Sequence, residues 1–192
     1  MNIFKALGDT VKVLKVIHAA GWVHRDISVN NLYWSQDGFG LLSDLEYAKR
    51  KSDAVAHDDV RTGTIQFIAS EVARCTYLFY FEDPEPGEEE LIFSHNDLHD
   101  LESLYWILVW ILLHREDLAN PLDSNLRQSR EYQMSQFFAP AFTNRTEFLS
   151  LRNNRLVISP SLTQQRTLPE LLGELSFKHI GMQSENFQVP SR

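Results

Sequence analysis

Hydrophobic residues near the amino terminus recur at steps of three and four positions. Because an α-helix has 3.6 residues per turn, this spacing places them on one helical face. The pattern predicts an amphipathic helix over residues 3–20, which ends at Gly21 because glycine commonly stops a helix. The residues that form the pattern are Phe4, Leu7, Val11, Leu14 and Ile17.

A second segment, residues 97–114, is apolar on nearly every face. It contains the longest apolar run of the chain, the ten residues from Leu104 to Leu113. A helix that is hydrophobic all round belongs in the middle of a domain. The run is shorter than the roughly 20 residues that cross a bilayer. We therefore predict a buried central helix over residues 97–114.

Weaker helical patterns follow, and prolines separate them. They cover residues 125–138, 145–151 and 168–175. We expect a helical carboxy-terminal region over residues 125–180. The predicted fold class is therefore mainly α.

One β-hairpin interrupts this helical pattern. The pair Asp37-Gly38 lies between two apolar runs, 32–34 and 39–42, and Asp-Gly is a strong signal for a two-residue hairpin turn. In that register Asn31 and Asp44 stand opposite each other at the open end, with Cα atoms roughly 5 Å apart. We expect a small β-hairpin with this pair at its base.

Such a pair can bind a cation. The amide oxygen of Asn31 and the carboxylate of Asp44 can share Mg²⁺, which prefers oxygen ligands. Asp26 lies five residues before Asn31, and a free carboxylate there can accept a proton from an attacking hydroxyl. Because Asp and Asn also form turns, the alternative interpretation is a plain loop and hairpin.

Composition narrows the class of protein. The 192 residues carry a net charge of −8, from 18 basic and 26 acidic side chains. Nucleic-acid binding requires clustered basic residues, so we expect no nucleic-acid partner. An acidic, proline-containing stretch at 76–95 is interpreted as a solvated insertion, and a patch that attracts basic partners is the alternative.

The single cysteine, Cys75, cannot form an intramolecular disulfide. No secretory signal is evident at the amino terminus. We therefore expect an intracellular protein, cytoplasmic or nuclear, without a membrane partner. The sequence does not indicate the oligomeric state.

Four motifs carry a family resemblance. The string 24–31, His-Arg-Asp-Ile-Ser-Val-Asn-Asn, resembles the catalytic loop H-R-D-x-x-x-x-N of eukaryotic-type protein kinases, and Asp44-Leu45-Glu46 resembles their D-F-G motif. Residues 63–71 resemble the end of a kinase activation segment, with Ala-Ser-Glu in place of A-P-E. Residues 100–104, Asp-Leu-Glu-Ser-Leu, resemble the start of the central helix. The Ile-Ser and Asp-Leu-Glu variants are most similar to fungal-type protein kinases.

The resemblance implies a protein kinase-like large (carboxy-terminal) lobe over residues 1–192. Its parts would be the catalytic loop at 24–31, the metal-binding motif at 44–46, the activation segment at 44–71 and the central helix. Only 23 residues precede His24, and they contain neither G-x-G-x-x-G nor V-A-I-K. We therefore expect the amino-terminal lobe, which grips the phosphates of ATP, to be absent.

The resemblance also implies roles at the site. Asp26 would be the catalytic base, and Asn31 and Asp44 would hold the Mg²⁺ that accompanies ATP. Tyr33 is a further cofactor-binding candidate. Thr64 would hydrogen-bond Asp26, as in serine/threonine kinases.

Two residues depart from the family pattern. Ser28, a catalytic candidate by position, replaces a lysine and cannot supply its charge to the phosphate. Glu46 replaces a glycine and removes its backbone freedom.

Supporting roles follow in the same way. His24 would pack in the core, and Arg25 would pair with a phosphorylated residue of the activation segment. Asp100 would accept backbone N–H groups of the catalytic loop. Glu71 would be buried against an arginine, for which the candidates are Arg145, Arg152 and Arg155.

Two functional hypotheses result. The first is phosphoryl transfer from Mg-ATP to serine or threonine hydroxyls of a protein substrate, which the presence of Asp26, Asn31 and Asp44 favours. The second is a kinase-derived binding or scaffold module, or a truncated product, that lacks the amino-terminal lobe and does not catalyse. A separate pair, His95 and His99, has zinc-ligand spacing. We interpret it as a histidine pair on the surface.

Overall fold

The computed structural model describes residues 3–53, 63–78, 93–138, 143–150, 156–163, 168 and 171. The described part is mainly helical, with two small antiparallel sheets. In chain order its elements are α1 (Ile3–Ala19), β1 (Trp22–Val23), η1 (Val29–Asn31), β2 (Leu32–Trp34), β3 (Gly40–Leu42), η2 (Leu45–Tyr47), β4 (Lys49–Arg50), α2 (Ser70–Arg74), α3 (Asp97–His114), α4 (Ser124–Phe137), α5 (Thr143–Ser150) and α6 (Pro160–Thr163).

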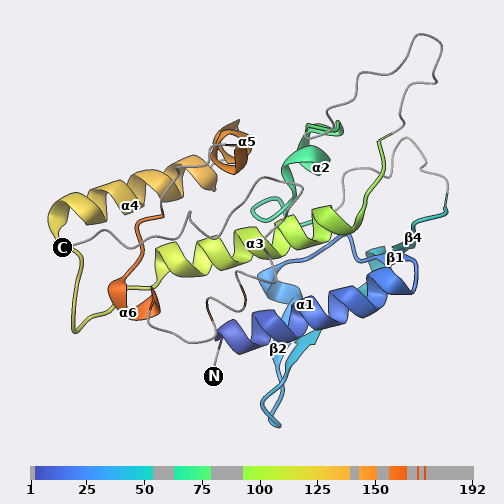
Figure 1. The fold of residues 1–192 in the computed structure, drawn as a ribbon, viewed down its shortest axis with the longest axis horizontal. Coiled ribbons are helices and arrows are strands. Elements are labelled where there is room, and N and C mark those ends of the chain that lie inside the picture. The colour runs from blue at the N-terminus through green and yellow to red at the C-terminus, as the bar shows by residue number, and fades with distance from the viewer. Residues whose placement is uncertain are drawn as a thin grey trace.

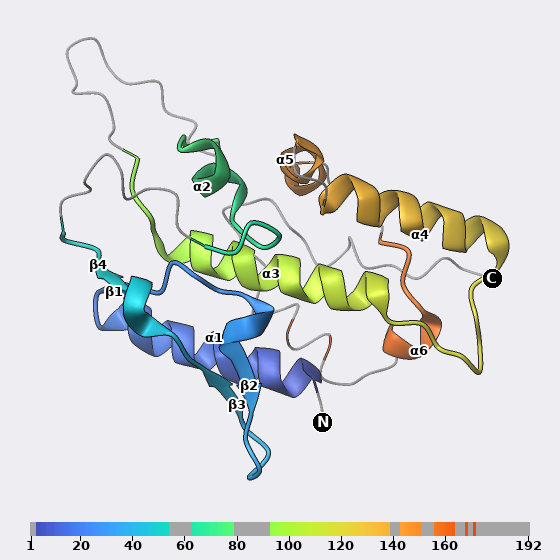
Figure 2. The same cartoon turned by 180° about the vertical axis from the view of Figure 1, so that it is seen from behind.

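Helix α3 runs through the middle of the molecule, with α1 on one side and α2, α4 and α5 on the other (Figure 1, Figure 2). Its bounds are those predicted, and most of its side chains are buried. Asn96 caps it: its side chain accepts the Leu98 N–H at 2.9 Å, and its own N–H donates to the His99 ring at 3.1 Å. This capping box fixes where the buried helix begins.

Helix α1 presents its predicted apolar face to α3. Phe4, Leu7, Val11 and Leu14 are buried in the same core as the central part of α3. The helix ends at Ala19, and Gly21 follows with a φ of 82°. That left-handed backbone suits glycine and turns the chain into β1.

The hairpin β2–β3 forms, but its register differs from the predicted one. Leu32 pairs with Leu42, and Trp34 pairs with Gly40. The loop has three residues, not two: the Ser35 N–H donates to Phe39 O at 2.8 Å, and Gly38 has a φ of 80°. The Gly38 N–H donates to Ser35 O at 3.1 Å, so a four-residue turn that ends at a left-handed glycine makes this loop. The predicted pairing of Asn31 with Asp44 is therefore wrong.

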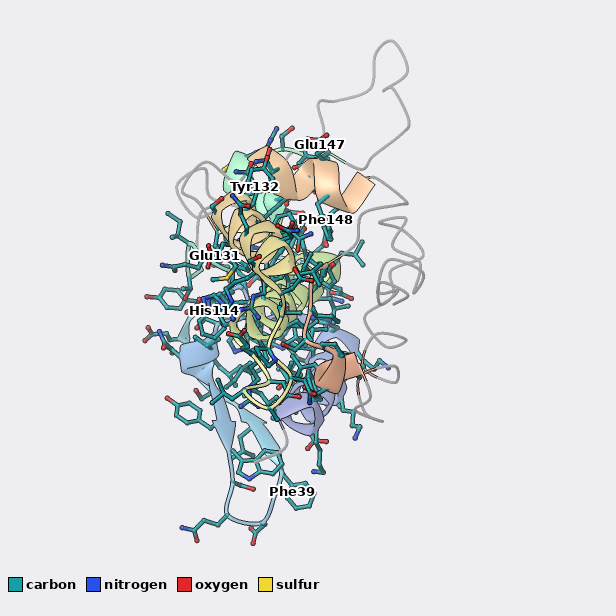
Figure 3. All side chains as sticks on the ribbon, turned by 90° about the vertical axis from the view of Figure 1, so that its left-hand side faces the viewer. Phe39, His114, Glu131, Tyr132, Glu147 and Phe148 are labelled. Carbon is teal, nitrogen blue, oxygen red and sulfur yellow. The ribbon has the colours of Figure 1, made fainter. Side chains whose placement is uncertain are left out.

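Helix α1 supports the hairpin through polar contacts. Lys5 donates to the carbonyl of Gly38 at 2.6 Å, and the Gly40 N–H donates to Asp9 at 3.1 Å. Burial alone would raise the pKa of Asp9, but the Gly40 N–H and the neighbouring lysines lower it to about 2. The Lys5 ammonium also lies 4.7 Å from the ring centroid of Phe39, which Figure 3 places at the far end of the hairpin.

A second sheet, β1–β4, was not predicted. Trp22 pairs with Arg50 and Val23 with Lys49, and the guanidinium of Arg50 lies over the ring of Trp22 at 5.2 Å. Strands of two residues are too short to show a periodic pattern, so no signal for them is visible in the sequence. The sheet pairs the residues directly before His24 with those that follow η2. It therefore holds together the two ends of the segment 24–48.

The carboxy-terminal helices α4 and α5 lie where helices were predicted, within two residues at each end. Phe148 on α5 is buried while its neighbour Glu147 is exposed (Figure 3). The predicted helix at 168–175 lies outside the described residues, except for the buried Leu168 and Leu171. Most of the predicted insertion at 76–95 lies outside them too. No helix in the described ranges is long and apolar enough to cross a membrane.

The close packing of the hairpin on α1 is testable with two glycines. A Cβ added at Gly40 would lie 2.5 Å from the carbonyl oxygen of Ala6, whereas one added at Gly8, within α1, meets nothing within 4 Å. We expect Gly40→Ala to lower the free energy of unfolding by about 1–3 kcal/mol. Gly8→Ala is the control and should raise it by about 0.5–1 kcal/mol. Urea unfolding measures both, and a Gly40→Ala protein as stable as wild type would contradict this packing.

Candidate functional site

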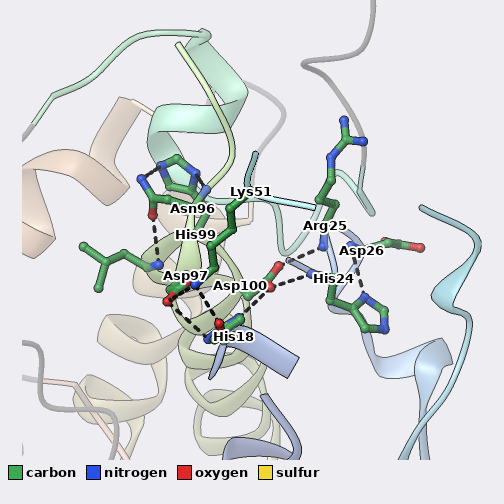
Figure 4. Close-up of polar contacts among 10 residues, drawn as sticks. His18, His24, Arg25, Asp26, Lys51, Asn96, Asp97, His99 and Asp100 are labelled. Atoms are coloured by element: carbon green, nitrogen blue, oxygen red, sulfur yellow. Dashed lines mark hydrogen bonds and ion pairs between the residues drawn. The ribbon is translucent and has the colours of Figure 1, made fainter. Parts of the chain in front are cut away.

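The loop after β1 is hydrogen-bonded to Asp100, which lies in the first turn of α3. The carboxylate accepts the N–H of His24 at 2.7 Å and that of Arg25 at 2.8 Å (Figure 4). Both hydrogen bonds were predicted and are confirmed. A third donor, His18 Nε2 at 2.9 Å, comes from the last turn of α1. One buried carboxylate thus joins α1, α3 and the loop.

These contacts explain the electrostatics of Asp100 and the shape of the loop. Burial alone would raise the pKa of Asp100, but the hydrogen bonds from His18 and the His24 N–H hold it below its ordinary value. Arg25 has a φ of 74°, a left-handed conformation that is costly for a residue with a side chain. The hydrogen bond to its N–H stabilises that conformation.

Both carboxylate oxygens of Asp26 accept hydrogen bonds. Oδ1 accepts the Thr64 N–H at 2.9 Å and the Thr64 hydroxyl at 3.1 Å, and Oδ2 accepts the side-chain N–H of Asn31 at 3.0 Å. The predicted contact of Thr64 with Asp26 is confirmed. The expectation of a free carboxylate is wrong, because the 24–31 loop and the segment after residue 63 both donate to it. Asp26 is only half-buried, so a substrate can still reach it.

Asn31 and Asp44 lie one step out of the predicted register. The Ser43 N–H donates to Asn31 O at 3.0 Å, so Ser43 faces Asn31 and Asp44 follows as the next residue. Asp44 has left-handed backbone angles, φ 65° and ψ 64°. Strand alternation therefore does not set the direction of its side chain. The Asp44 carboxylate is exposed and caps no helix, and its sharing of a cation with Asn31 stays a prediction.

The remaining candidates of the loop and hairpin differ in exposure. His24 is fully buried, and its Nε2 lies 3.0 Å from Ser43 O, so it contacts the residue just before the predicted metal-binding motif. Ser28 is also buried, and no described residue hydrogen-bonds its hydroxyl. Tyr33 is 56% exposed on the outer face of β2, opposite Leu41.

Arg25 is buried, and its burial lowers the pKa of its guanidinium, against the opposing charge of Asp100. Its expected partner is a phosphorylated residue of the 44–71 segment. Residues 54–62 of that segment lie outside the described part of the chain. The pairing stays a prediction.

Glu71 contacts a histidine that was not among its expected partners. Its carboxylate lies 2.8 Å from Nε2 of His99 and also accepts the Leu78 N–H at 2.7 Å. Of the candidate arginines, Arg145 donates to backbone carbonyls. The other two lie outside the described residues, so the pairing of Glu71 with either of them stays a prediction. The interpretation of a surface histidine pair is wrong. His99 is 1% exposed, and burial and the neighbouring His99 lower the pKa of His95 to about 3.

A metal site at these histidines finds no support. Among the described residues no three His, Cys, Asp or Glu side chains are grouped to hold a metal ion. His99 uses one ring nitrogen on Glu71 and the other on the helix cap. The pair is part of the framework of α3.

Sequence reasoning missed two residues that hold the loop. His18 follows Leu14 by four positions, so it lies on the buried stripe of α1, and that spacing was the available signal. Lys51 bridges Asp97 at 2.6 Å and the carbonyl of His18 at 2.9 Å (Figure 4). No motif marks Lys51, because its partners are distant in sequence.

Comparison of the sequence with known proteins places the chain in a family. A family model described as fungal protein kinase matches residues 1–112, more than half of the chain. Two relatives, both named serine/threonine-protein kinase cst-1, come from Caenorhabditis briggsae and Caenorhabditis elegans. Each is 34% identical over 71 residues, which is 37% of this chain. The match spans only 14% of the length of either relative.

The different tasks of Asp100 and Asp26 give a stability prediction. Asp100→Ala leaves buried donors on His18, His24 and Arg25, so we expect it to lower the free energy of unfolding by about 1–3 kcal/mol. Asp26→Ala should cost less, because Thr64 is half-buried and can donate to water, and the Asn31 side-chain amide keeps the backbone carbonyl of residue 26 as an acceptor. Thermal and urea unfolding of the two variants compare them. An equal or larger loss in Asp26→Ala would show that the two roles are reversed.

The Asp100 effect should also depend on pH. Its folded pKa lies below the ordinary value of 3.8, so its stabilisation is present above that value and is lost as pH falls further. The difference in the free energy of unfolding between wild type and Asp100→Ala should therefore become smaller as the pH falls below 3.8. A difference that widens below pH 4 would contradict this assignment.

Proposed function

Because the chain belongs to the fungal protein kinase family, we propose that it transfers a phosphoryl group from Mg-ATP to serine or threonine hydroxyls of a protein substrate. The observation that carries this proposal is the grip on Asp26. Its carboxylate is fixed by Thr64 and Asn31 and yet is only half-buried. A scaffold carboxylate such as Asp100 is fully buried instead.

In this proposal Asp26 accepts the proton of the substrate hydroxyl. The hydroxyl oxygen then forms its bond to the γ-phosphorus as the bond between that phosphorus and ADP breaks. The two hydrogen bonds from Thr64 orient one carboxylate oxygen, and the Asn31 amide orients the other. Such fixed orientation is what a positioned base requires.

The donor groups present fit Mg²⁺. Asn31 uses its side-chain N–H groups on Asp26, and no described residue donates to its amide oxygen. Asp44 offers an exposed carboxylate directly after the residue that pairs with Asn31. Amide and carboxylate oxygens are the ligands that Mg²⁺ takes in sites of this class. When bound, the ion would neutralise charge on the phosphates.

Two features reduce the expected rate. The Ser28 hydroxyl stands in place of a lysine and is buried, so it brings no charge to a phosphate. The sequence also contains no G-x-G-x-x-G and no V-A-I-K. We therefore expect weak affinity for ATP in the chain taken alone.

The same observations favour a second candidate, a kinase-like binding module that does not catalyse. Its surface would include the outer face of the hairpin and η2, where large apolar side chains are exposed. These residues are Tyr33, Leu41, Leu45 and Tyr47. The two candidates differ in whether Asp26 performs chemistry.

A transfer assay separates them. The full chain is incubated with radiolabelled ATP at millimolar concentration, Mg²⁺ and a mixed protein acceptor. We expect slow labelling of serine and threonine that falls about 100-fold or more in Asp26→Asn, because a positioned base contributes about 10²–10⁴. Asp37→Asn, an exposed turn carboxylate on the hairpin, is the control and should be unchanged. Absence of labelling by wild type, or equal labelling by Asp26→Asn, would reject catalysis and support the binding module.

A further inference from the structure

The segment between Thr64 and α2 is a compact turn that reaches the site. The carbonyl of Thr64 accepts the N–H groups of Phe67 and Ile68, at 2.8 Å and 3.0 Å. Thr64 itself holds Asp26. Whatever fixes residues 66–70 therefore also fixes Thr64.

Glu102 fixes the end of this turn. It lies on α3 and is 2% exposed, and its Oε1 accepts three donors. These are the Ser70 N–H at 2.9 Å, the Ser70 hydroxyl at 2.7 Å and the indole N–H of Trp106 at 2.9 Å. A buried carboxylate held in this way is costly to remove, because each donor then loses its acceptor.

Serine at position 70 makes this contact feasible. The kinase motif A-P-E has proline here, which has neither a backbone N–H nor a hydroxyl. Ser70 supplies both groups to one oxygen of Glu102. Although 32 positions separate them in sequence, Ser70 and Glu102 complement each other as hydrogen-bond donor and acceptor.

Arg145 holds the middle of the turn from the opposite side. It is fully buried on α5 and donates to the carbonyls of Gln66, Ile68 and Phe137. Its guanidinium lies 4.6 Å from the ring centroid of Trp106. Burial lowers the pKa of Arg145 to about 10, and the negative charge of Glu102 opposes that decrease. Arg145 therefore stays charged at neutral pH.

We propose that Glu102 is a positioning residue that, with Arg145, anchors residues 66–70 on the helical core and thereby holds Thr64 against Asp26. Its place on α3 supports this role. Asp100 and Glu102 are two positions apart, about 200° around the helix at 100° per residue. One side of α3 thus holds the 24–25 loop and the other holds the 66–70 turn. The consequence for phosphoryl transfer rests on the proposed function, whereas the anchoring itself does not.

Amide hydrogen exchange of the full chain without nucleotide tests the anchoring. The reporter is the exchange rate of the Thr64 N–H divided by that of the Arg25 N–H, which Asp100 holds. We expect Glu102→Ala to raise this ratio about tenfold or more, because the local turn opens independently of the loop. Glu102→Gln should stay close to wild type, because its amide oxygen can accept the same three donors.

Two further variants make the result decisive. Leu104→Ala, buried on the same helix, lowers global stability while it keeps Glu102, Ser70 and Arg145, and should leave the ratio unchanged. If Glu102→Ala does not fold, Ser70→Ala removes one donor and should raise the ratio by a smaller factor. An unchanged ratio in Glu102→Ala and Ser70→Ala, or a rise in Glu102→Gln equal to that in Glu102→Ala, overturns the proposal. A chain that transfers no phosphate would reject the proposed function but would not alter this ratio.

Discussion

The buried carboxylate of Asp100 is the constraint on which the rest of the site depends. It accepts hydrogen bonds from three buried donors, the N–H groups of His24 and Arg25 and the ring N–H of His18. These hydrogen bonds also fix the loop in which Arg25 has a left-handed backbone conformation. Such a conformation is costly and persists only where the surrounding structure stabilises it. Because Asp100 lies in the first turn of the most buried helix, its hydrogen bonds attach the loop directly to the packed core. The position of Asp26 follows directly.

The site is assembled from three parts that touch at Asp26. The loop supplies the carboxylate, the hairpin base supplies Asn31, and the turn after residue 63 supplies Thr64. Helix α3 anchors two of these parts, through Asp100 and Glu102, and α1 supports the hairpin through Asp9 and Lys5. Local sequence therefore provides the reactive groups, while helices distant in sequence provide their alignment. This division explains why motif residues alone do not describe the site.

Long periodic patterns allowed the sequence to predict α1 and α3, and the family resemblance predicted the contacts of Asp100 and Thr64 with the loop. The hairpin was predicted correctly but its register was wrong, because Asp-Gly suits both a two-residue turn and the three-residue loop that ends with Gly38 in left-handed form. The contact of Glu71 with His99 was not predicted, because the resemblance suggested an arginine partner and gave no signal for a histidine from the cap of α3. Contacts such as Glu102 with Ser70 depend on how helices pack, which no local pattern encodes.

We expect this framework to bring Asn31 and Asp44 together around one divalent cation beside Asp26. A crystal structure of the full chain grown with Mn²⁺, which substitutes for Mg²⁺ and gives an anomalous signal, tests it most directly. We expect a single strong peak bound by the side-chain oxygen of Asn31 and a carboxylate oxygen of Asp44, with Asp26 nearby and still hydrogen-bonded to Thr64. A peak that lacks either ligand, or a saturated crystal with no peak at the base of the hairpin, would show that Asn31 and Asp44 do not share a cation.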